Sequence, residues 1–66
     1  MAFIVNGEQT PLPNAGTLAG YLAAQGLLDK HIVIELNGAI RRRDEWDSIL
    51  LQASDALEIV AFVGGG

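Results

Sequence analysis

The sequence predicts a small α+β domain: a mixed sheet of four to five strands with one helix packed across one face. Two Asn-Gly pairs, one helical segment and a final apolar strand indicate this class. Asn-Gly is the strongest short signal for a β-hairpin, because a type I′ turn needs positive φ at both central residues. A chain of 66 residues is expected to form one domain of modest stability, since so short a chain buries only part of its surface.

The chain opens with a predicted β-hairpin. Residues 2–5 are apolar and rich in the β-branched and aromatic side chains that favour strands. The Asn6-Gly7 turn then leads into a second short strand over residues 8–12. Pro11 and Pro13 restrict this second strand to an edge of the sheet, because proline has no N–H to donate to a neighbouring strand.

One helix is predicted after the hairpin. Thr17 is a good N-cap, since its hydroxyl can accept a hydrogen bond from a backbone N–H of the first turn. Leu18 and Leu22 follow at helical spacing, and Gly26 is a typical left-handed stop. So short a helix is unstable alone. We therefore expect the Leu18 and Leu22 face to pack on the sheet.

The second half of the chain supplies the remaining strands. Residues 31–36 form one strand, and Asn37-Gly38 turns the chain into a further short strand. The charged run 41–47 predicts an irregular turn or a short helical turn around Trp46. The last strand starts at Leu57 and leads into the glycines at the end of the sequence.

Side chains alternate between the two faces of a strand, so the pattern also predicts the core. One apolar cluster between sheet and helix is expected, made of Phe3, Val5, Leu18, Leu22, Ile34, Leu36, Leu50, Leu57 and Ile59. The other face then presents Ile4, Val33, Val60 and Phe62 as an exposed apolar patch, a feature that usually marks an interaction surface. Glu35 and Glu58 are expected to rim this patch and to attract a basic partner.

The order of elements is hairpin, helix, strand pair and final strand. This order predicts the β-grasp, or ubiquitin-like, arrangement, in which the first and last strands lie side by side at the centre of the sheet. We assign residues 1–63 to the β-grasp domain and residues 64–66 to a flexible glycine-rich tail.

Composition excludes several classes of function. The net charge is −4, whereas a nucleic-acid binder carries a basic surface. There is no cysteine, and one histidine with scattered carboxylates makes neither a catalytic triad nor a metal site. No segment is long and apolar enough to cross a bilayer. We expect a cytoplasmic carrier or interaction module, monomeric when free, that is not an enzyme and binds no cofactor or metal itself.

The sequence ends in Gly64-Gly65-Gly66 directly after an apolar strand. Glycine has no Cβ, so such a tail can lie extended in a slot too narrow for other residues. The Gly66 carboxylate is then the group best placed for chemistry, with Gly64 and Gly65 threading it into an active site. The alternative is a frayed end or a cloning remnant, because disorder concentrates at termini.

Over nearly its full length the chain resembles the ThiS family, the sulfur carriers of thiamin biosynthesis. The shared features are the two Asn-Gly turns, the Thr17-Leu18 helix start, the segment from the arginines to Trp46, and the Gly65-Gly66 end. Ser54-Asp55 precedes the last strand, where the family usually has Gly-Asp.

This resemblance implies a cycle at the Gly66 carboxylate. A ThiF-like activating enzyme, using ATP and Mg²⁺, would adenylate the carboxylate. A persulfide sulfur derived from a cysteine desulfurase would displace AMP and leave a thiocarboxylate. A ThiG-like thiazole synthase would then take the sulfur.

Three alternatives remain open at this point. The chain could be a small subunit of molybdopterin synthase of the MoaD type, a ubiquitin-like protein modifier, or a β-grasp binding module whose glycines have no role. His31 and the run Arg41-Arg42-Arg43 are interpreted as exposed polar residues rather than as ligands. Trp46 is expected to pack at the edge of the core.

Overall fold

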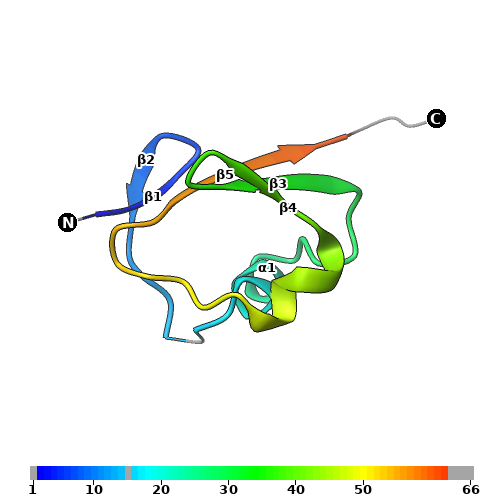
Figure 1. Cartoon of the computed structure of the whole chain (residues 1–66), viewed down its shortest axis with the longest axis horizontal. Coiled ribbons are helices and arrows are strands. Elements are labelled where there is room, and N and C mark those ends of the chain that lie inside the picture. The colour runs from blue at the N-terminus through cyan, green and yellow to red at the C-terminus, as the bar shows by residue number, and fades with distance from the viewer. Residues whose placement is uncertain (1, 15, 63–66) are drawn as a thin grey trace.

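The computed structural model describes residues 2–14 and 16–62. The elements in chain order are β1 (Phe3–Val5), β2 (Glu8–Thr10), α1 (Leu18–Ala24), β3 (Ile32–Leu36), β4 (Ala39–Arg41), the 3-10 helix η1 (Arg43–Ser48) and β5 (Ala56–Ala61). The strands form one sheet in the order β2-β1-β5-β3-β4. Helix α1 and η1 lie on the same side of this sheet (Figure 1). The α+β class and the five-stranded mixed sheet are as predicted.

Strand β5 occupies the centre of the sheet, as predicted for the last strand. It runs parallel to β1, where Val5 is the neighbour of Leu57, and antiparallel to β3, where Ile34 is the neighbour of Ile59. Because β5 has a strand on each side, its position is fixed by hydrogen bonds along both of its edges. Both neighbours flank the start of β5, whereas its last residues pair with β3 alone, where Ile32 is the neighbour of Ala61.

Both Asn-Gly pairs form the predicted turns, with φ of 51° and 83° at Asn6-Gly7 and of 52° and 85° at Asn37-Gly38. The asparagine side chains do more than turn the chain. Asn6 Oδ1 accepts a hydrogen bond from the Ile59 amide at 2.7 Å, and Asn37 Oδ1 accepts one from the Ala56 amide at 2.8 Å. Each hairpin turn is thereby attached to β5.

Helix α1 begins and ends at the predicted residues. Thr17 is the N-cap, and its hydroxyl accepts a hydrogen bond from the Gly20 amide at 3.0 Å. At the other end Gly26 has φ of 73°, and the Leu27 amide donates to the Leu22 carbonyl at 2.9 Å. This is the Schellman arrangement, which glycine permits because it lacks a Cβ.

Three strands are shorter than predicted, the first of them because it starts at Phe3 rather than Ala2. The second strand ends at Thr10 rather than Leu12, just before Pro11, which has no N–H for a ladder. The third starts at Ile32, although the His31 carbonyl still accepts a hydrogen bond from the Phe62 amide at 3.0 Å.

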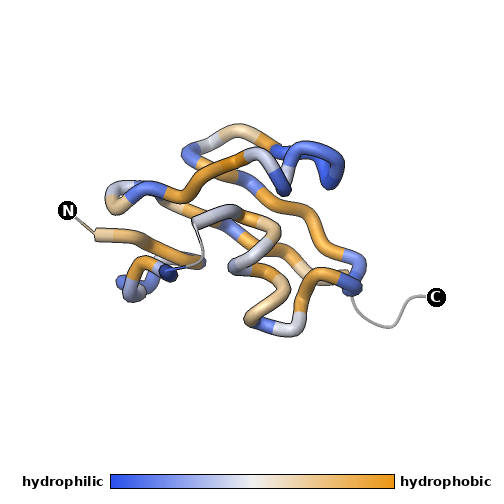
Figure 2. The backbone as a smooth tube through the Cα atoms, turned by 90° about the horizontal axis from the view of Figure 1, so that it is seen from below, coloured by the Kyte–Doolittle hydropathy of each residue, from blue (hydrophilic) through white to orange (hydrophobic). Residues whose placement is uncertain are grey.

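The core lies between the sheet and the two helices. Its buried members are Phe3, Leu18, Ala19, Tyr21, Leu22, Ile32, Ile34, Leu36, Trp46, Leu51 and Leu57, with Val5, Leu27, Ile49 and Ile59 packed against them. Figure 2, seen from the helix side, shows hydrophobic strands and hydrophilic residues gathered in the turns and at the ends of the sheet. Eight of the nine predicted core residues belong to this cluster or pack against it.

The prediction for Leu50 is wrong, because its side chain is 63% exposed. Residues 49–51 are extended, since Leu18 N–H donates to the Ile49 carbonyl and Leu51 N–H donates to the Gly16 carbonyl. Neighbouring side chains of an extended segment point in opposite directions. Leu51 therefore enters the core and Leu50 faces outward.

Trp46 is more deeply buried than the sequence indicated, with 2% of its surface exposed. The indole Nε1 donates to the Arg41 carbonyl at 3.0 Å, which satisfies the one polar group of the side chain. Helix η1 is stabilised at its start by reciprocal bonds. Arg42 N–H donates to the Glu45 carboxylate, and Glu45 N–H donates to the Arg42 carbonyl.

Asp55 is buried, with 8% of its surface exposed, at the turn that precedes β5. Its carboxylate accepts hydrogen bonds from Asn37 Nδ2 and from the Gln52 amide, both at 2.8 Å. Replacement of Asp55 by alanine is expected to destabilise the protein by about 2–4 kcal/mol, since each partly buried donor left without an acceptor costs about 1–3 kcal/mol. Urea unfolding measures this loss. Alanine at the exposed Asp47 is the matched control, and equal effects of the two changes would contradict the assigned role of Asp55.

Candidate functional site

The candidate site lies at the end of the sheet where β5 ends. Phe62, the last described residue, stays attached to the sheet because its backbone N–H donates a hydrogen bond to the His31 carbonyl. Its ring also meets the His31 imidazole edge to face, with the centroids 5.4 Å apart. The predicted tail residues, Gly64 to Gly66, and the predicted domain boundary after residue 63 lie outside the described residues.

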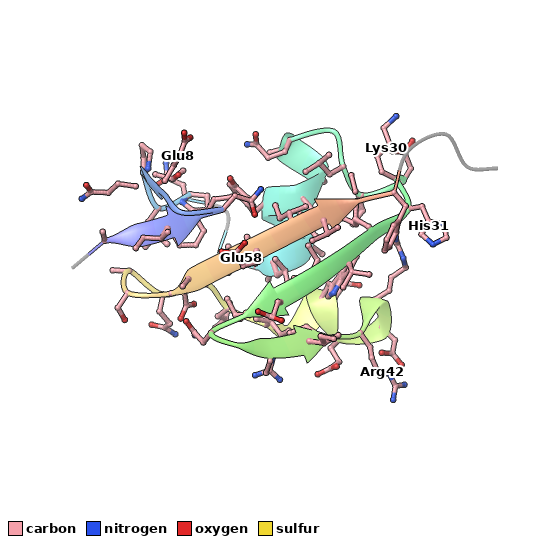
Figure 3. All side chains as sticks on the ribbon, turned by 90° about the horizontal axis from the view of Figure 1, so that it is seen from above. Glu8, Lys30, His31, Arg42 and Glu58 are labelled. Atoms are coloured by element: carbon pink, nitrogen blue, oxygen red, sulfur yellow. The ribbon has the colours of Figure 1, made fainter. Side chains whose placement is uncertain are left out.

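The face of the sheet opposite α1 and η1, here called the open face, is turned toward the viewer in Figure 3. Val33 and Val60 are cross-strand neighbours, and Phe62 follows two residues later on the same face. Val60 is 52% exposed and Phe62 is 54% exposed. We call these three residues the terminal apolar patch.

Ile4 is placed elsewhere on the open face. Its neighbour on β5 is Ala56, at the beginning of that strand, whereas Val60 is near the strand's end. Four residues of extended chain span about 13 Å. The sequence predicted one patch of four side chains. In the structure three of them form the terminal apolar patch, and Ile4 lies apart from it.

Glu35 and Glu58 are direct cross-strand neighbours on β3 and β5. They border the terminal apolar patch on the side that faces the Ala56 end of β5, and so separate this patch from Ile4. Ile40, on the edge strand β4, is the neighbour of Glu35 on its other side and is 67% exposed. Ile40 is not among the patch residues predicted from the sequence. Residues 39–41 are too few for an alternating pattern to show which face of the sheet Ile40 occupies.

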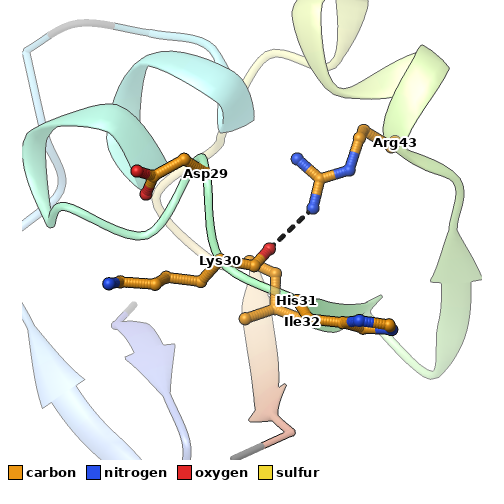
Figure 4. A pocket seen from close by; sticks show the side chains of 5 residues that line it. All are labelled: Asp29, Lys30, His31, Ile32 and Arg43. Carbon is orange, nitrogen blue, oxygen red and sulfur yellow. Dashed lines mark hydrogen bonds between the residues drawn. The ribbon is translucent and has the colours of Figure 1, made fainter. Parts of the chain in front are cut away.

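A shallow pocket adjoins the same end of the sheet, lined by Asp29, Lys30, His31, Ile32 and Arg43 (Figure 4). The Arg43 guanidinium donates to the Leu28 carbonyl at 2.6 Å and to the Lys30 carbonyl at 2.8 Å. It also lies 4.5 Å from the centre of the Trp46 ring, a cation–π contact. Arg43 therefore connects the loop after α1 to η1. The pocket lies between these two elements.

The other two arginines of the run pair with nearby carboxylates. Arg41 lies 3.6 Å from Glu45, and Arg42 lies 2.8 Å from Asp44. The hydrogen bond to Asp44, together with the charges of Asp44 and Glu45, raises the pKa of the exposed Arg42 side chain. These contacts account for the charged run within the domain. His31 is exposed and contacts Phe62, as described above.

Residues 2–14 and 16–62 offer neither a metal site nor a membrane span. Within these ranges no three His, Asp or Glu side chains gather where they could hold a metal ion. The helices of this part of the chain are too short to span a membrane. The feature that distinguishes the described surface is therefore the open face beside the end of β5.

Comparison with known proteins identifies the family. The ThiS family model matches residues 3–66. The thiazole synthase of Magnetococcus marinus is 33% identical over all 66 residues of this chain, which span 20% of that protein. The sulfur carrier protein ThiS of Bacillus subtilis is 36% identical over 53 residues, 80% of each chain. The chain thus covers about a fifth of the length of the thiazole synthase relatives and most of the length of the sulfur carrier.

Comparison with solved structures points to the same family. The crystal structure of the thiamine biosynthesis protein ThiS from Geobacter metallireducens superposes with a TM-score of 0.79 at 29% identity, over 100% of both chains. This match confirms the β-grasp arrangement predicted from the order of the elements. From the family match over residues 3–66 and these relatives, the chain belongs to the ThiS family.

Proposed function

We propose that this chain is a sulfur carrier of thiamin biosynthesis that acts through the Gly66 carboxylate. The observation that carries the proposal is the family match, which extends through the glycines to residue 66. The B. subtilis relative is named a sulfur carrier protein, which supports the same role. The thiazole synthase relatives support a thiazole synthase of the ThiG type as the acceptor of the sulfur.

The chemistry follows from the weakness of a carboxylate as an electrophile. A ThiF-like enzyme with ATP and Mg²⁺ forms the Gly66 acyl-adenylate and releases pyrophosphate. A persulfide that originates from a cysteine desulfurase displaces AMP, and a thiol then cleaves the sulfur–sulfur bond to leave the thiocarboxylate. This chain has no cysteine that could attack the activated carbonyl. It is a co-substrate of these enzymes rather than a catalyst.

The described fold supports this role by giving the carrier a rigid body. Strand β5 is held between β1 and β3, and Phe62 is still attached to the sheet. A partner that grips the open face near Phe62 would hold the following residues at a set distance from its active site. We propose that the docking surface consists of Val33, Val60 and Phe62, with Ile4 contributing at the far end of β5.

Intact-mass measurement tests the function. The protein is incubated with the activating enzyme, ATP, Mg²⁺ and a persulfide donor, and we expect a mass gain equal to exchange of one oxygen for sulfur. Transfer of this sulfur to a thiazole synthase, rather than to a molybdopterin precursor, would separate the thiamin pathway from the MoaD alternative. Conjugation to lysines would indicate a protein modifier, and no change of mass would contradict the proposal.

The docking surface makes a separate prediction. Val60→Asp and Phe62→Asp are expected to weaken binding to the activating enzyme by about tenfold or more, since a carboxylate would have to be desolvated at the interface. Both side chains are more than half exposed, so the melting temperature should change little. Leu50→Asp is the matched control, because Leu50 is 63% exposed and belongs to a segment that pairs with Thr17 rather than to the open face. Unchanged binding of both open-face variants would place the docking surface elsewhere.

A further inference from the structure

The open face carries two carboxylates directly opposite each other near the middle of the sheet. Glu35 on β3 and Glu58 on β5 are cross-strand neighbours, and Glu58 lies near the centre of the view in Figure 3. Opposite residues of an antiparallel pair have Cβ atoms about 4.5–5.5 Å apart, and like charges in this arrangement repel. We call Glu35 and Glu58 the carboxylate pair.

The described part of the chain does not neutralise this pair. Its two ion pairs join Arg41 to Glu45 and Arg42 to Asp44. The Arg43 guanidinium is bound to backbone carbonyls at the pocket. Lys30 precedes Glu35 by five residues, about 16 Å along an extended chain. The free protein thus keeps two repelling charges in the centre of an exposed face.

Apolar side chains lie on two sides of the carboxylate pair. Val33 and Val60 are the next cross-strand pair on one side, and Ile40 is the neighbour of Glu35 on β4. A partner that covers these apolar groups must also cover the two carboxylates. Burying a carboxylate without a counter-charge is costly, so the covering surface must itself supply a cation at this point.

From this geometry we infer that the activating enzyme, docked on the open face, places an arginine side chain between Glu35 and Glu58. This inference rests on the proposed carrier function and specifies the chemistry of the partner's surface. A guanidinium has five N–H donors in a planar fork and is more weakly hydrated than an ammonium group. It can therefore bridge two carboxylates while its flat faces rest on the neighbouring apolar side chains.

The carboxylate pair then contributes to specificity. An apolar patch alone accepts many hydrophobic surfaces, whereas a buried pair of carboxylates rejects any surface that lacks a cation at the same place. The repulsion that destabilises the free carrier is relieved in the complex, so removing it from the free protein should stabilise the fold while weakening the complex.

Charge reversal at Glu58 tests the inference with the full chain and the ThiF-like activating enzyme. Glu58→Lys should raise the dissociation constant by about tenfold or more, because a cation would meet the partner's arginine. The same change should raise the melting temperature, since the introduced lysine would pair with Glu35 across the strands. Weaker binding by a more stable protein cannot be explained by misfolding.

Glu8→Lys is the matched control, because it changes the net charge equally but lies on the edge strand β2, away from β5 (Figure 3). Glu8→Lys should change the dissociation constant much less than Glu58→Lys. Equal effects of Glu8→Lys and Glu58→Lys on the dissociation constant would overturn the inference. Tighter binding by Glu58→Gln would also overturn it, because it would mean that the Glu58 carboxylate has no cationic partner in the complex. If the unaltered protein neither binds the enzyme nor gains sulfur, the proposed function itself fails, which is a distinct result.

Discussion

Deletion of Gly66, or replacement of Gly65 by leucine, is expected to abolish adenylation while the fold stays intact. Deletion moves the carboxylate one residue closer to the domain, and leucine adds a branched side chain to a tail that, on the proposed function, threads into a narrow slot. The described core is formed by residues between Phe3 and Ile59, well before the glycines. Activation should therefore be lost without loss of stability, as measured by ATP–pyrophosphate exchange and by thermal melting.

Binding of these variants separates docking from chemistry. Because the proposed docking surface is upstream of the tail, the shortened chain should still compete with the unaltered protein for the activating enzyme. A control with alanine at Gly64, which is farther from the reacting carboxylate, should retain more activity than leucine at Gly65. Full adenylation of the Gly66 deletion, or a melting temperature several degrees lower, would contradict this prediction.

Leu57→Ala is expected to lower the free energy of unfolding by about 2–5 kcal/mol, the range for removing a fully buried leucine side chain. Leu57 has no exposed surface and lies on the central strand, beside Val5 on β1 and Leu36 on β3. The cavity would open in the closely packed core beside three strands, where little can move to fill it. In a domain of this size the loss is a large part of the total stability.

Leu50→Ala is the matched control, since it is the same chemical change at a side chain that is 63% exposed. Urea unfolding of both variants measures the difference, and Leu50→Ala should cost less than about 1 kcal/mol. Similar losses at the two positions would mean that the sheet register, and with it the division into a core face and an open face, is different from the one described.

Local chemistry accounts for the features that the sequence predicted correctly. Asn6-Gly7 and Asn37-Gly38 are good turns because of their own backbone preferences. Thr17 caps a helix with its own hydroxyl, and Gly26 ends that helix because it tolerates positive φ. Each of these signals acts within a few residues, so each can be recognised without knowing what lies across the sheet.

Leu50 and Trp46 show where this local reasoning ends. Leu50-Leu51 contains two equivalent leucines, and only the pairing of residues 49–51 with residues 16–18 decides which of them faces the core. Trp46 sits in a charged run, yet η1 packs against the same side of the sheet as α1 and buries the indole. In both cases the burial depends on segments that are distant in sequence.

The sequence by itself determined the β-grasp class, the hairpin turns, the helix ends and the alternation that gives β5 a core face and an open face. These follow from backbone preferences and from the two-residue period of a strand. Only the tertiary structure decided that Glu35 and Glu58 are direct neighbours and that Ile4 is separated from the terminal apolar patch. The reason is physical: cross-strand register sets these distances, and register depends on packing across the whole sheet rather than on any one segment.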